Sequence, residues 1–405
     1  MDKQENGKAA GQAEEELLSQ INSSLSKQIN EQFEMDVVKE TEWQSSTKKN
    51  RKVPLWFKVS TIVFAVILLV GVGSLLWLNS LYGNMNYEDG TEVKQEAEIF
   101  EQDEDAKDLE EVDPNAVKWD ETTDGARKDD NVINILLVGE ESINDGDSRG
   151  RTDSIMIATI NKKEKAIKLT SVMRDTYVQI PGYSDNKLNA AYHSGGMPLL
   201  VDTIKRNFDL EVDGYVLVDF DGFETIMDKL GGVEVELSNT EANYLNRTNY
   251  ISNPANRNVS AGKRTLNGNQ ALGYARVRYV PNGNLSDDFG RTSRQREVLN
   301  AIFEKYKSKS AIELIAMLPD MLQLVTTNIQ KDEFMNYITT VVTLGPSELE
   351  TFRLPIDEGY KNTRIRGMSV LLPDDLQSNI DALHKFVFGD EVQVSSPSPS
   401  ITTQN

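Results

Sequence analysis

The chain of 405 residues contains no cysteine and only two histidines, His193 and His384. Without thiols it can form neither disulfide bonds nor the cysteine sites that hold zinc, and two imidazoles are too few for a histidine-rich metal centre. A metal ion would therefore have to be held by oxygen ligands. We interpret His193 as a structural histidine and set serine hydrolysis aside.

Basic residues are also scarce, because 43 lysines and arginines stand against 64 aspartates and glutamates, which gives a net charge of −21. Nucleic-acid binding depends on a basic surface that neutralises phosphates, so we expect no nucleic-acid partner. Thirteen of the acidic residues lie within residues 88–113, where the only basic residues are Lys94 and Lys107. We predict that residues 83–130 form an extended, acidic extracellular linker.

One long stretch lacks charge altogether. Residues 59–82 contain about 20 consecutive, mostly apolar residues, the length that a helix needs to cross a bilayer. Basic residues precede this stretch and acidic residues follow it, which predicts a cytoplasmic N-terminus and an extracellular remainder. A cleaved signal peptide is the alternative, but 58 residues precede the stretch, so we favour an uncleaved, single-pass anchor in the cell membrane.

The remaining ranges differ in composition. We predict a polar cytoplasmic tail at residues 1–58, a folded extracytoplasmic domain at residues 131–390 and a disordered tail, rich in serine and proline, at residues 391–405. A domain of roughly 260 residues is large enough to bury a core without disulfide bonds.

Three apolar segments at the start of this domain predict strands at residues 133–139, 154–160 and 166–172. Further strands and helices follow, including a strand at residues 214–220 and then a helix that stops at a glycine pair. We therefore predict an α/β fold, a layered α-β-α sandwich with a mixed central sheet, preceded by the one N-terminal transmembrane helix.

The ends of the first three strands are predicted to lie at one edge of the sheet. A short turn joins the second and third strands, so they should form an antiparallel hairpin that brings Arg151, Asp153 and Arg174 together. Glu140 and Glu141 reach the same edge if the first strand runs parallel to the third.

Arginine is concentrated in one region, because six of the 17 arginines lie within residues 264–296. Arg276 and Arg278 would leave the same face of an extended segment. The apolar stripe of the following helix continues backwards onto Arg294, Gln295 and Arg291, which should point inward.

Two kinds of partner would satisfy these arginines, since a buried guanidinium needs a carboxylate or a bound anion. Pairing with the nearby Asp287 and Asp288 would make them structural. A cluster of planar guanidinium groups also suits phosphate oxygens, and an acid such as Asp153 could hold a divalent ion that neutralises the same phosphates. For the set as a whole, the pattern favours the phosphate site.

Seven segments match the motifs of a known family: LLVGEE (136–141), GRTDSIM (150–156), SVMRD (171–175), NKLNAAY (186–192), GYVLVDFDGF (214–223), LNGNQALGYARVRY (266–279) and DDFGRTSRQRE (287–297). Each motif is weak alone, but their order and spacing are specific. Over about residues 131–310 the chain resembles the LytR-CpsA-Psr family of membrane-anchored cell-wall glycopolymer ligases.

The resemblance implies that residues 131–390 are a catalytic domain, a phosphotransferase (ligase) that depends on Mg²⁺, with Mn²⁺ as the alternative metal. It would move a glycopolymer, such as wall teichoic acid or capsular polysaccharide, from an undecaprenyl-pyrophosphate carrier in the membrane lipid to a hydroxyl of peptidoglycan, forming a phosphodiester. The implied catalytic residues are Arg151, Asp153, Arg174, Arg276 and Arg278, the implied pyrophosphate ligands are Lys187, Arg291 and Gln295, and the implied metal ligands are Asp153 and Glu141. The family usually has aspartate where this chain has Glu141.

In such a reaction the metal and the arginines would stabilise charge as the hydroxyl attacks and lipid phosphate leaves. Asp153, Glu141 and Asp288 are alternative acceptors for the hydroxyl proton. Two other functions stay open: a lipid-pyrophosphate phosphatase, for which water is the acceptor, and a non-catalytic membrane-bound regulator or transcription attenuator. The absence of a basic DNA-reading element from the sequence opposes direct regulation.

Overall fold

The computed structural model describes residues 86–90, 95–103, 106–119, 125–141, 149–309, 311–346 and 348–389. All of them belong to one unit, Leu75–Asn405. The predicted cytoplasmic tail, membrane span and C-terminal tail lie outside the described residues. Within the ranges given above, no helix is long and apolar enough to cross a membrane.

The strands are β1 (Asn86–Tyr87), β2 (Val132–Glu141), β3 (Arg151–Asn161), β4 (Ala166–Val172), β5 (Tyr177–Val178), β6 (Asn186–Lys187), β7 (Gly214–Asp219), β8 (Val233–Leu237), β9 (Gly262–Leu266), β10 (Thr326–Thr327), β11 (Leu349–Leu354), β12 (Tyr360–Ile365) and β13 (Met368–Pro373). The helices are α3 (Leu188–Phe208), α4 (Phe220–Leu230), α5 (Asn239–Arg247), α6 (Gly268–Arg276), α7 (Asp287–Ser308), α8 (Ala311–Leu322), α9 (Lys331–Leu344) and α10 (Leu376–Phe388), with short 3₁₀ helices η2 (Pro114–Ala116) and η3 (Pro254–Asn256).

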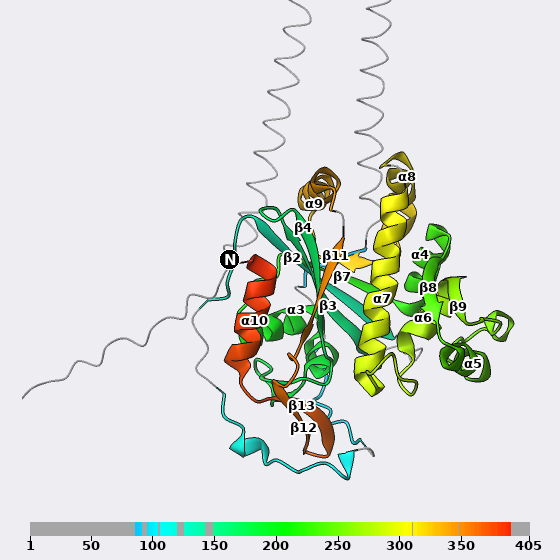
Figure 1. Cartoon of the computed structure of the whole chain (residues 1–405). Coiled ribbons are helices and arrows are strands. Elements are labelled where there is room, and N and C mark those ends of the chain that lie inside the picture. The colour runs from blue at the N-terminus through cyan, green and yellow to red at the C-terminus, as the bar shows by residue number, and fades with distance from the viewer. Residues whose placement is uncertain are drawn as a thin grey trace, which may run out of the picture. The chain divides into compact units, whose positions relative to one another are not determined.

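Seven strands form one mixed sheet in the order β1-β10-β7-β2-β3-β4-β11 (Figure 1). β2 pairs antiparallel with β3, and β3 pairs antiparallel with β4, so β2 and β4 run in the same direction. β7 lies parallel to β2, and β11 lies parallel to β4. The predicted α/β fold with a mixed central sheet is confirmed, and so is the predicted hairpin of β3 and β4.

Strand β2 is apolar on both faces because helices cover both sides of the sheet. Leu136 and Val138 pack with α3 and α10 in one core cluster. Ile133 and Ile135, which point the other way, pack against α9. A predominantly apolar run of this kind is typical of a strand buried on two sides. Figure 1 shows α3 and α10 on one side of the sheet and α4, α6 and α7 on the other.

Helices α4 and α6 pack closely on each other, which fixes where α6 ends. The helix α6 begins with a capping box, in which the side chains of Asn267 and Gln270 each bond the other's main chain. Gly268 lies so close to α4 that a Cβ atom there would overlap the main-chain carbonyl of Glu224. The last residue of α6, Arg276, consequently reaches the end of β2, where it bonds Glu141.

The prediction of an extended segment carrying both Arg276 and Arg278 is wrong. Arg276 is the last residue of α6, and Val277 is the first residue after it with extended dihedral angles. The capping box starts a helix here, and helical hydrogen bonding prevails over the alternation of arginine and valine. Both arginines nevertheless reach the same cavity, as described below.

The prediction that residues 83–130 form an extended spacer is also wrong for the parts of this range that the structure describes. β1 joins the edge of the central sheet by pairing with β10. Further along, Phe100, Val117 and Trp119 pack against a cluster that contains Tyr177 and the β12-β13 hairpin. Burial of these apolar side chains outweighs the mutual repulsion of the acids, which solvent and salt screen.

Candidate active site

Polar side chains at the ends of three neighbouring strands meet at the same end of the central sheet, as predicted. β2 ends at Glu141, β3 begins at Arg151, and β4 ends two residues before Arg174. The pairing of β2 with β3 shifts register after Gly139, which marks a β-bulge. Bulges commonly re-aim side chains next to functional sites.

Asp153 lies at the centre of an arginine cluster. Its carboxylate accepts hydrogen bonds from Arg174 and, at 3.2 Å, from Arg291. Gln295 donates to the main-chain carbonyl of Asp153 at 3.3 Å. Burial raises the pKa of Asp153, but the charges of Arg291 and Arg174 outweigh burial, so the pKa lies below its ordinary value. The carboxylate is therefore ionised at neutral pH.

Arg291 is buried, as the stripe of α7 predicts, and it has two carboxylate partners. Its guanidinium lies 2.7 Å from Asp288 Oδ1 and 3.2 Å from Asp153 Oδ1. Arg174 and Arg278 each approach the same Asp288 oxygen to 3.7 Å. Three guanidinium groups thus approach one oxygen of Asp288. Desolvation lowers the pKa of Arg291.

Arg276 and Glu141 form a more exposed pair on the other side of Asp153. The guanidinium donates to Glu141 Oε1 at 2.6 Å and lies 4.4 Å from the centre of the Phe220 ring. Side chains in partly exposed ion pairs contribute little to stability. An incoming anion could therefore replace Glu141 as the partner of Arg276 at small cost.

Lys187 is held by three carboxylates, none of which was predicted from the sequence as a site residue. Its Nζ lies 2.8 Å from Asp103, 3.0 Å from Asp175 and 3.7 Å from Glu101. Burial lowers the pKa of Lys187, but the neighbouring carboxylates, Asp175 first, raise it by more, so the ammonium stays charged. Glu101 and Asp103 belong to the range predicted to be a linker.

These side chains line a cavity of about 290 Å³, which we call the charged cleft: Glu101, Asp103, Glu141, Asp153, Arg174, Asp175, Lys187, Tyr250, Arg276, Arg278, Arg291 and Ser369. The lining contains five cations and five carboxylates. An anion can bind there if a carboxylate moves aside or takes up a cation. The side chain of Arg151, predicted to act here, lies outside the described residues.

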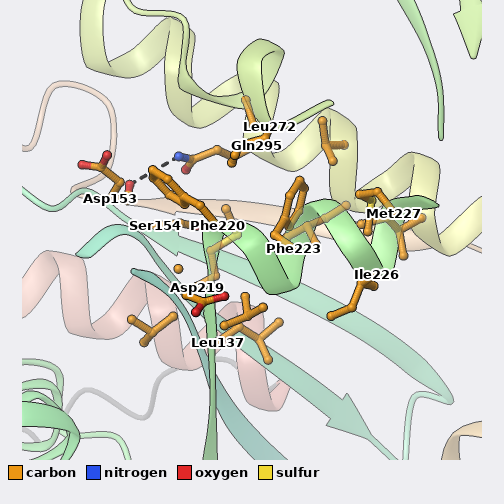
Figure 2. Close-up of a pocket in the computed structure, with 18 of the residues that line it drawn as sticks. Leu137, Asp153, Ser154, Asp219, Phe220, Phe223, Ile226, Met227, Leu272 and Gln295 are labelled. Carbon is orange, nitrogen blue, oxygen red and sulfur yellow. Dashed lines mark hydrogen bonds between the residues drawn. The ribbon is translucent and has the colours of Figure 1, made fainter. Parts of the chain in front are cut away.

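A second cavity of about 260 Å³, the apolar cavity, adjoins the charged cleft, and Asp153 and Arg276 line both. It lies between the sheet and helices α4, α6 and α7 (Figure 2). Figure 2 shows Asp153 and Gln295 at one end and the apolar side chains of α4 along its length. Most of its lining is apolar: Leu137, Val138, Met156, Val216, Val218, Phe220, Phe223, Ile226, Met227, Leu272, Ala275, Val298, Leu299, Ile302 and Val325.

Arg294 belongs to the fold and not to the cleft. It is fully buried and donates to the Glu241 carboxylate at 2.9 Å and to the main-chain carbonyls of Val277 and Val280. The alternative in which an arginine serves only local pairing thus holds for this residue.

Serine hydrolysis finds no support in the fold. One Gly-x-Ser-x-Gly pattern exists, at residues 146–150, but its serine lies outside the described residues. The pattern connects the antiparallel strands β2 and β3, whereas a nucleophile elbow joins a strand to a helix. His193, in α3, lies 3.5 Å from Glu96, in agreement with a structural role.

The donor set for a metal ion is small. Within the described part of the chain, no group of three or more histidine, aspartate or glutamate side chains is arranged to hold a metal. The two predicted metal ligands, Asp153 and Glu141, are among the five carboxylates that line the charged cleft. In phosphate sites Mg²⁺ commonly takes one or two protein carboxylates and completes its coordination with waters and phosphate oxygens. The pair therefore fits a magnesium ion that binds together with a phosphate ligand.

A cleft with five cationic side chains that adjoins an apolar cavity is suited to amphiphilic anions, such as lipid phosphates, once a carboxylate moves aside or binds a cation. The chain matches the model of the LytR_cpsA_psr family over residues 87–384, and it belongs to this family. The match includes most of the range that composition assigns to a linker.

Individual proteins are also similar to this chain. The chain is 32% identical over 267 residues to "Regulatory protein MsrR" of Staphylococcus aureus, which covers 66% of this chain and 77% of MsrR. It is 34% identical over 205 residues to TagV of Bacillus subtilis, a polyisoprenyl-teichoic acid–peptidoglycan teichoic acid transferase, which covers 50% of this chain and 51% of TagV. The solved structure "TagT bound to LIIa-WTA" has 26% identity and a TM-score of 0.53, and it covers 67% of this chain and 96% of that chain.

Proposed function

We propose that this protein transfers a glycopolymer from a polyprenyl-pyrophosphate carrier to a hydroxyl group of peptidoglycan and so forms a phosphodiester. The observation that carries the proposal is the junction of the two cavities at Asp153 and Arg276. The apolar cavity suits the prenyl chain, and the charged cleft suits the pyrophosphate. Wall teichoic acid and capsular polysaccharide are the glycopolymers that the motifs favour.

Two of the similar proteins, TagV and TagT, support the same reaction. TagV is named for the transfer of teichoic acid from a polyisoprenyl carrier to peptidoglycan, and TagT has been solved with LIIa-WTA bound. MsrR, in contrast, carries the name of a regulator. The charged cleft supports a lipid-phosphate ligand, because five cations line a volume that adjoins an apolar cavity.

Four arginines would bind the pyrophosphate directly: Arg174, Arg276, Arg278 and Arg291 all line the charged cleft. Bidentate guanidinium groups match phosphate oxygens in shape and charge. Lys187 would assist from the far end of the cleft, and Gln295 would hold the main chain of Asp153 in place. Arg151 is included in this set only because its motif resembles that of the family.

Mg²⁺, with Mn²⁺ as an alternative, would be held by Asp153 and Glu141 together with the phosphates. When bound, the ion would neutralise charge on the phosphate oxygens. Arg276 pairs with Glu141 and Arg174 pairs with Asp153, and these guanidinium groups could turn to the substrate if the two carboxylates held the ion instead. A glutamate in place of the family's aspartate places the carboxylate one methylene further from the main chain.

The chemistry then depends on position and charge. The arginines orient the pyrophosphate and stabilise charge that develops as the hydroxyl attacks phosphorus, and the lipid phosphate leaves toward the apolar cavity. A chain in which residues 59–82 span the membrane, with the N-terminus in the cytoplasm, would place this site outside the cell beside both the carrier and peptidoglycan.

Incubation of the full chain with Mg²⁺, a polyprenyl-pyrophosphate-linked saccharide and peptidoglycan fragments tests this function, with products followed by mass spectrometry. A saccharide joined to the fragment by a phosphodiester supports the transferase. Release of lipid phosphate without a coupled product would instead identify a phosphatase. Tight binding of the carrier without turnover would identify a receptor or regulator.

A further inference from the structure

One aromatic side chain lies among the charged side chains of the charged cleft. Of the described residues that line this cleft, ten carry charge, and the other two are Tyr250 and Ser369. Tyr250 does not line the apolar cavity, whose aromatic side chains are Phe220 and Phe223. Tyr250 therefore faces the volume that suits the pyrophosphate and not the volume that suits the prenyl chain.

Contacts with helix α6 fix the position of Tyr250. Gly273 of α6 lies so close that a Cβ atom there would come within 2.9 Å of the main-chain carbonyl oxygen of Tyr250. The next residue, Ile251, is fully buried, and its carbonyl accepts a hydrogen bond from Arg257 Nε at 2.8 Å. Arg276, which lines the charged cleft, is the last residue of the same helix. Helix α6 thus holds the main chain of Tyr250 and that of Arg276 in a fixed arrangement.

Two more tyrosines lie near Tyr250. The ring centre of Tyr244 is 5.6 Å from that of Tyr250, with an angle of 41° between the ring planes. Burial first, and then Tyr250 and Tyr279, raise the pKa of Tyr244 above its ordinary value, in agreement with their proximity. Tyr279 directly follows Arg278 of the charged cleft, and it is 65% exposed. A group of aromatic rings thus adjoins the cleft, and one ring forms part of its lining.

The proposed donor carries a sugar beside its pyrophosphate. In a pyrophosphate-linked glycopolymer one phosphate carries the prenyl chain, and the other carries the first sugar through a single bridging oxygen. A pyrophosphate bound to the arginines of the charged cleft therefore places this sugar within the cleft or next to it. Charged side chains can bind its hydroxyls, but the C–H groups on the face of a pyranose ring need an apolar surface. The face of an aromatic ring is apolar and carries partial negative charge, which attracts such C–H groups.

We infer that Tyr250 binds the first sugar of the lipid-linked donor by stacking against the face of its pyranose ring. The inference rests on the proposed transferase function and names a residue that recognises the saccharide part of the donor. The prenyl chain then contacts the apolar cavity, the pyrophosphate contacts the arginines, and the sugar contacts Tyr250. Stacking on a ring face discriminates little between sugars, so Tyr250 recognises the presence of a pyranose and not its identity.

The test measures the binding of two ligands that differ only in the sugar. Titration calorimetry with the full chain and Mg²⁺ compares farnesyl pyrophosphate with farnesyl pyrophosphate that carries one N-acetylglucosamine. We expect the wild type to bind the sugar-bearing ligand more tightly. Tyr250→Leu should raise the Kd of the sugar-bearing ligand about five- to tenfold and change the Kd of farnesyl pyrophosphate less than about twofold. Tyr250→Phe keeps the ring, so both of its Kd values should stay within about twofold of the wild type.

Tyr87→Leu is the matched control, because Tyr87 is also a partly exposed tyrosine, 45% exposed, and lines neither cavity. Its two Kd values should stay within about twofold of the wild type. An equal loss of affinity for both ligands in Tyr250→Leu overturns the inference, because it would assign the side chain to the pyrophosphate or to folding. An unchanged Kd of the sugar-bearing ligand overturns it as well.

Two further outcomes also decide the inference. A change in Tyr250→Leu that is confined to the KM for the peptidoglycan fragment would overturn it, because Tyr250 would then bind a sugar of the acceptor. If Tyr250→Leu does not fold, Tyr250→Gln is measured in its place, and equal Kd values of the wild type for the two ligands overturn the inference.

The proposed function can fail separately from the sugar site. A wild-type chain may prefer the sugar-bearing ligand, and lose this preference in Tyr250→Leu, without transferring saccharide to peptidoglycan fragments. That result would refute the transferase and support the sugar site. A wild-type chain that binds neither ligand would refute both.

Discussion

Lys187 Nζ lies 2.8 Å from the carboxylate of Asp103, a residue 84 positions earlier in the chain. This ion pair brings a side chain from the range that composition assigns to a spacer into the lining of the charged cleft. The cleft is consequently incomplete without the residues that precede the predicted domain start at residue 131.

A chain that starts at residue 131 should therefore be less stable than one that starts at residue 83. It lacks β1 and the partly buried side chains of Phe100, Val117 and Trp119, which together remove apolar surface from water at about 25 cal/mol per Å². We expect a loss of at least about 3 kcal/mol in the free energy of unfolding, measured by urea denaturation. Equal stability of the two chains would show that the segment is dispensable.

Substitution by alanine should lower activity at Arg276 and stability at Arg294. Arg276→Ala removes a partly exposed side chain of the cleft, so we expect transfer activity to fall about 10²- to 10³-fold while unfolding changes by less than about 1 kcal/mol. Arg294→Ala leaves Glu241 buried without its partner and should cost about 3–5 kcal/mol. Activity assays and urea denaturation of both variants check this, and the reverse order would contradict the assignment of the two residues.

Much of the site follows from local sequence. The short turn between β3 and β4 places Asp153 beside Arg174 whatever the rest of the chain does, and the stripe of α7 predicts that Arg291 is buried. The helix that carries Arg276 could also have been predicted from the sequence, because Asn267 and Gln270 have the spacing of a capping box. Alternation of arginine with valine was the weaker signal.

The remaining part of the site depends on contacts between distant segments. The sequence of residues 88–113 does not distinguish Glu101 and Asp103 as partners of Lys187, because eleven other acids lie in the same range. A signal did exist in Phe100, Val117 and Trp119, since large apolar side chains are uncommon in a solvated spacer. Their burial identifies the segment as part of the fold.

Filling the apolar cavity should weaken binding of the lipid carrier. Ile226 of α4 lines the cavity (Figure 2), and the indole of Ile226→Trp would occupy part of its volume. We expect KM for the lipid-linked donor to rise at least about tenfold, equivalent to about 1.4 kcal/mol of binding, with kcat little changed. Lys229→Trp, on the exposed side of the same helix, is the control and should bind as the wild type does. Unchanged KM in Ile226→Trp would place the lipid elsewhere.

His384 should make stability depend on pH. Its Nε2 lies 3.2 Å from the carbonyl of Phe208 and 2.9 Å from that of Asp209, and burial lowers its pKa below 6.5. The folded state thus prefers the neutral ring, so this stabilisation is complete above about pH 6.5 and is lost as pH falls toward the lowered pKa. The loss amounts to at most about 1.4 kcal/mol per pH unit.

Urea denaturation at pH 8.0, 6.5 and 5.5 measures this loss. We expect the stability of His384→Gln to change less between pH 6.5 and 5.5 than that of the wild type, because the amide does not titrate. The same change with pH in both proteins would assign the effect to other groups.

Magnesium should bind together with a pyrophosphate ligand and not by itself. Asp153 and Glu141 supply only two carboxylates, and both pair with arginines. We expect Mg²⁺ to raise the Tm of the chain further in the presence of geranyl pyrophosphate, and to have little effect without it, since only ligands of the folded state stabilise it. EDTA should abolish the increment.

Substitutions at the two proposed metal ligands should affect the Mg²⁺-dependent increment in Tm differently. Asp153→Asn should lose the increment, because it removes an anionic ligand from the centre of the cleft. Glu141→Asp should keep it, since a carboxylate remains at the position where the family has aspartate. Glu297→Gln serves as control, because Glu297 bonds Tyr274 and Asn282 and does not line the charged cleft. A full increment in Asp153→Asn would mean that the metal, if it binds, is held by other oxygens.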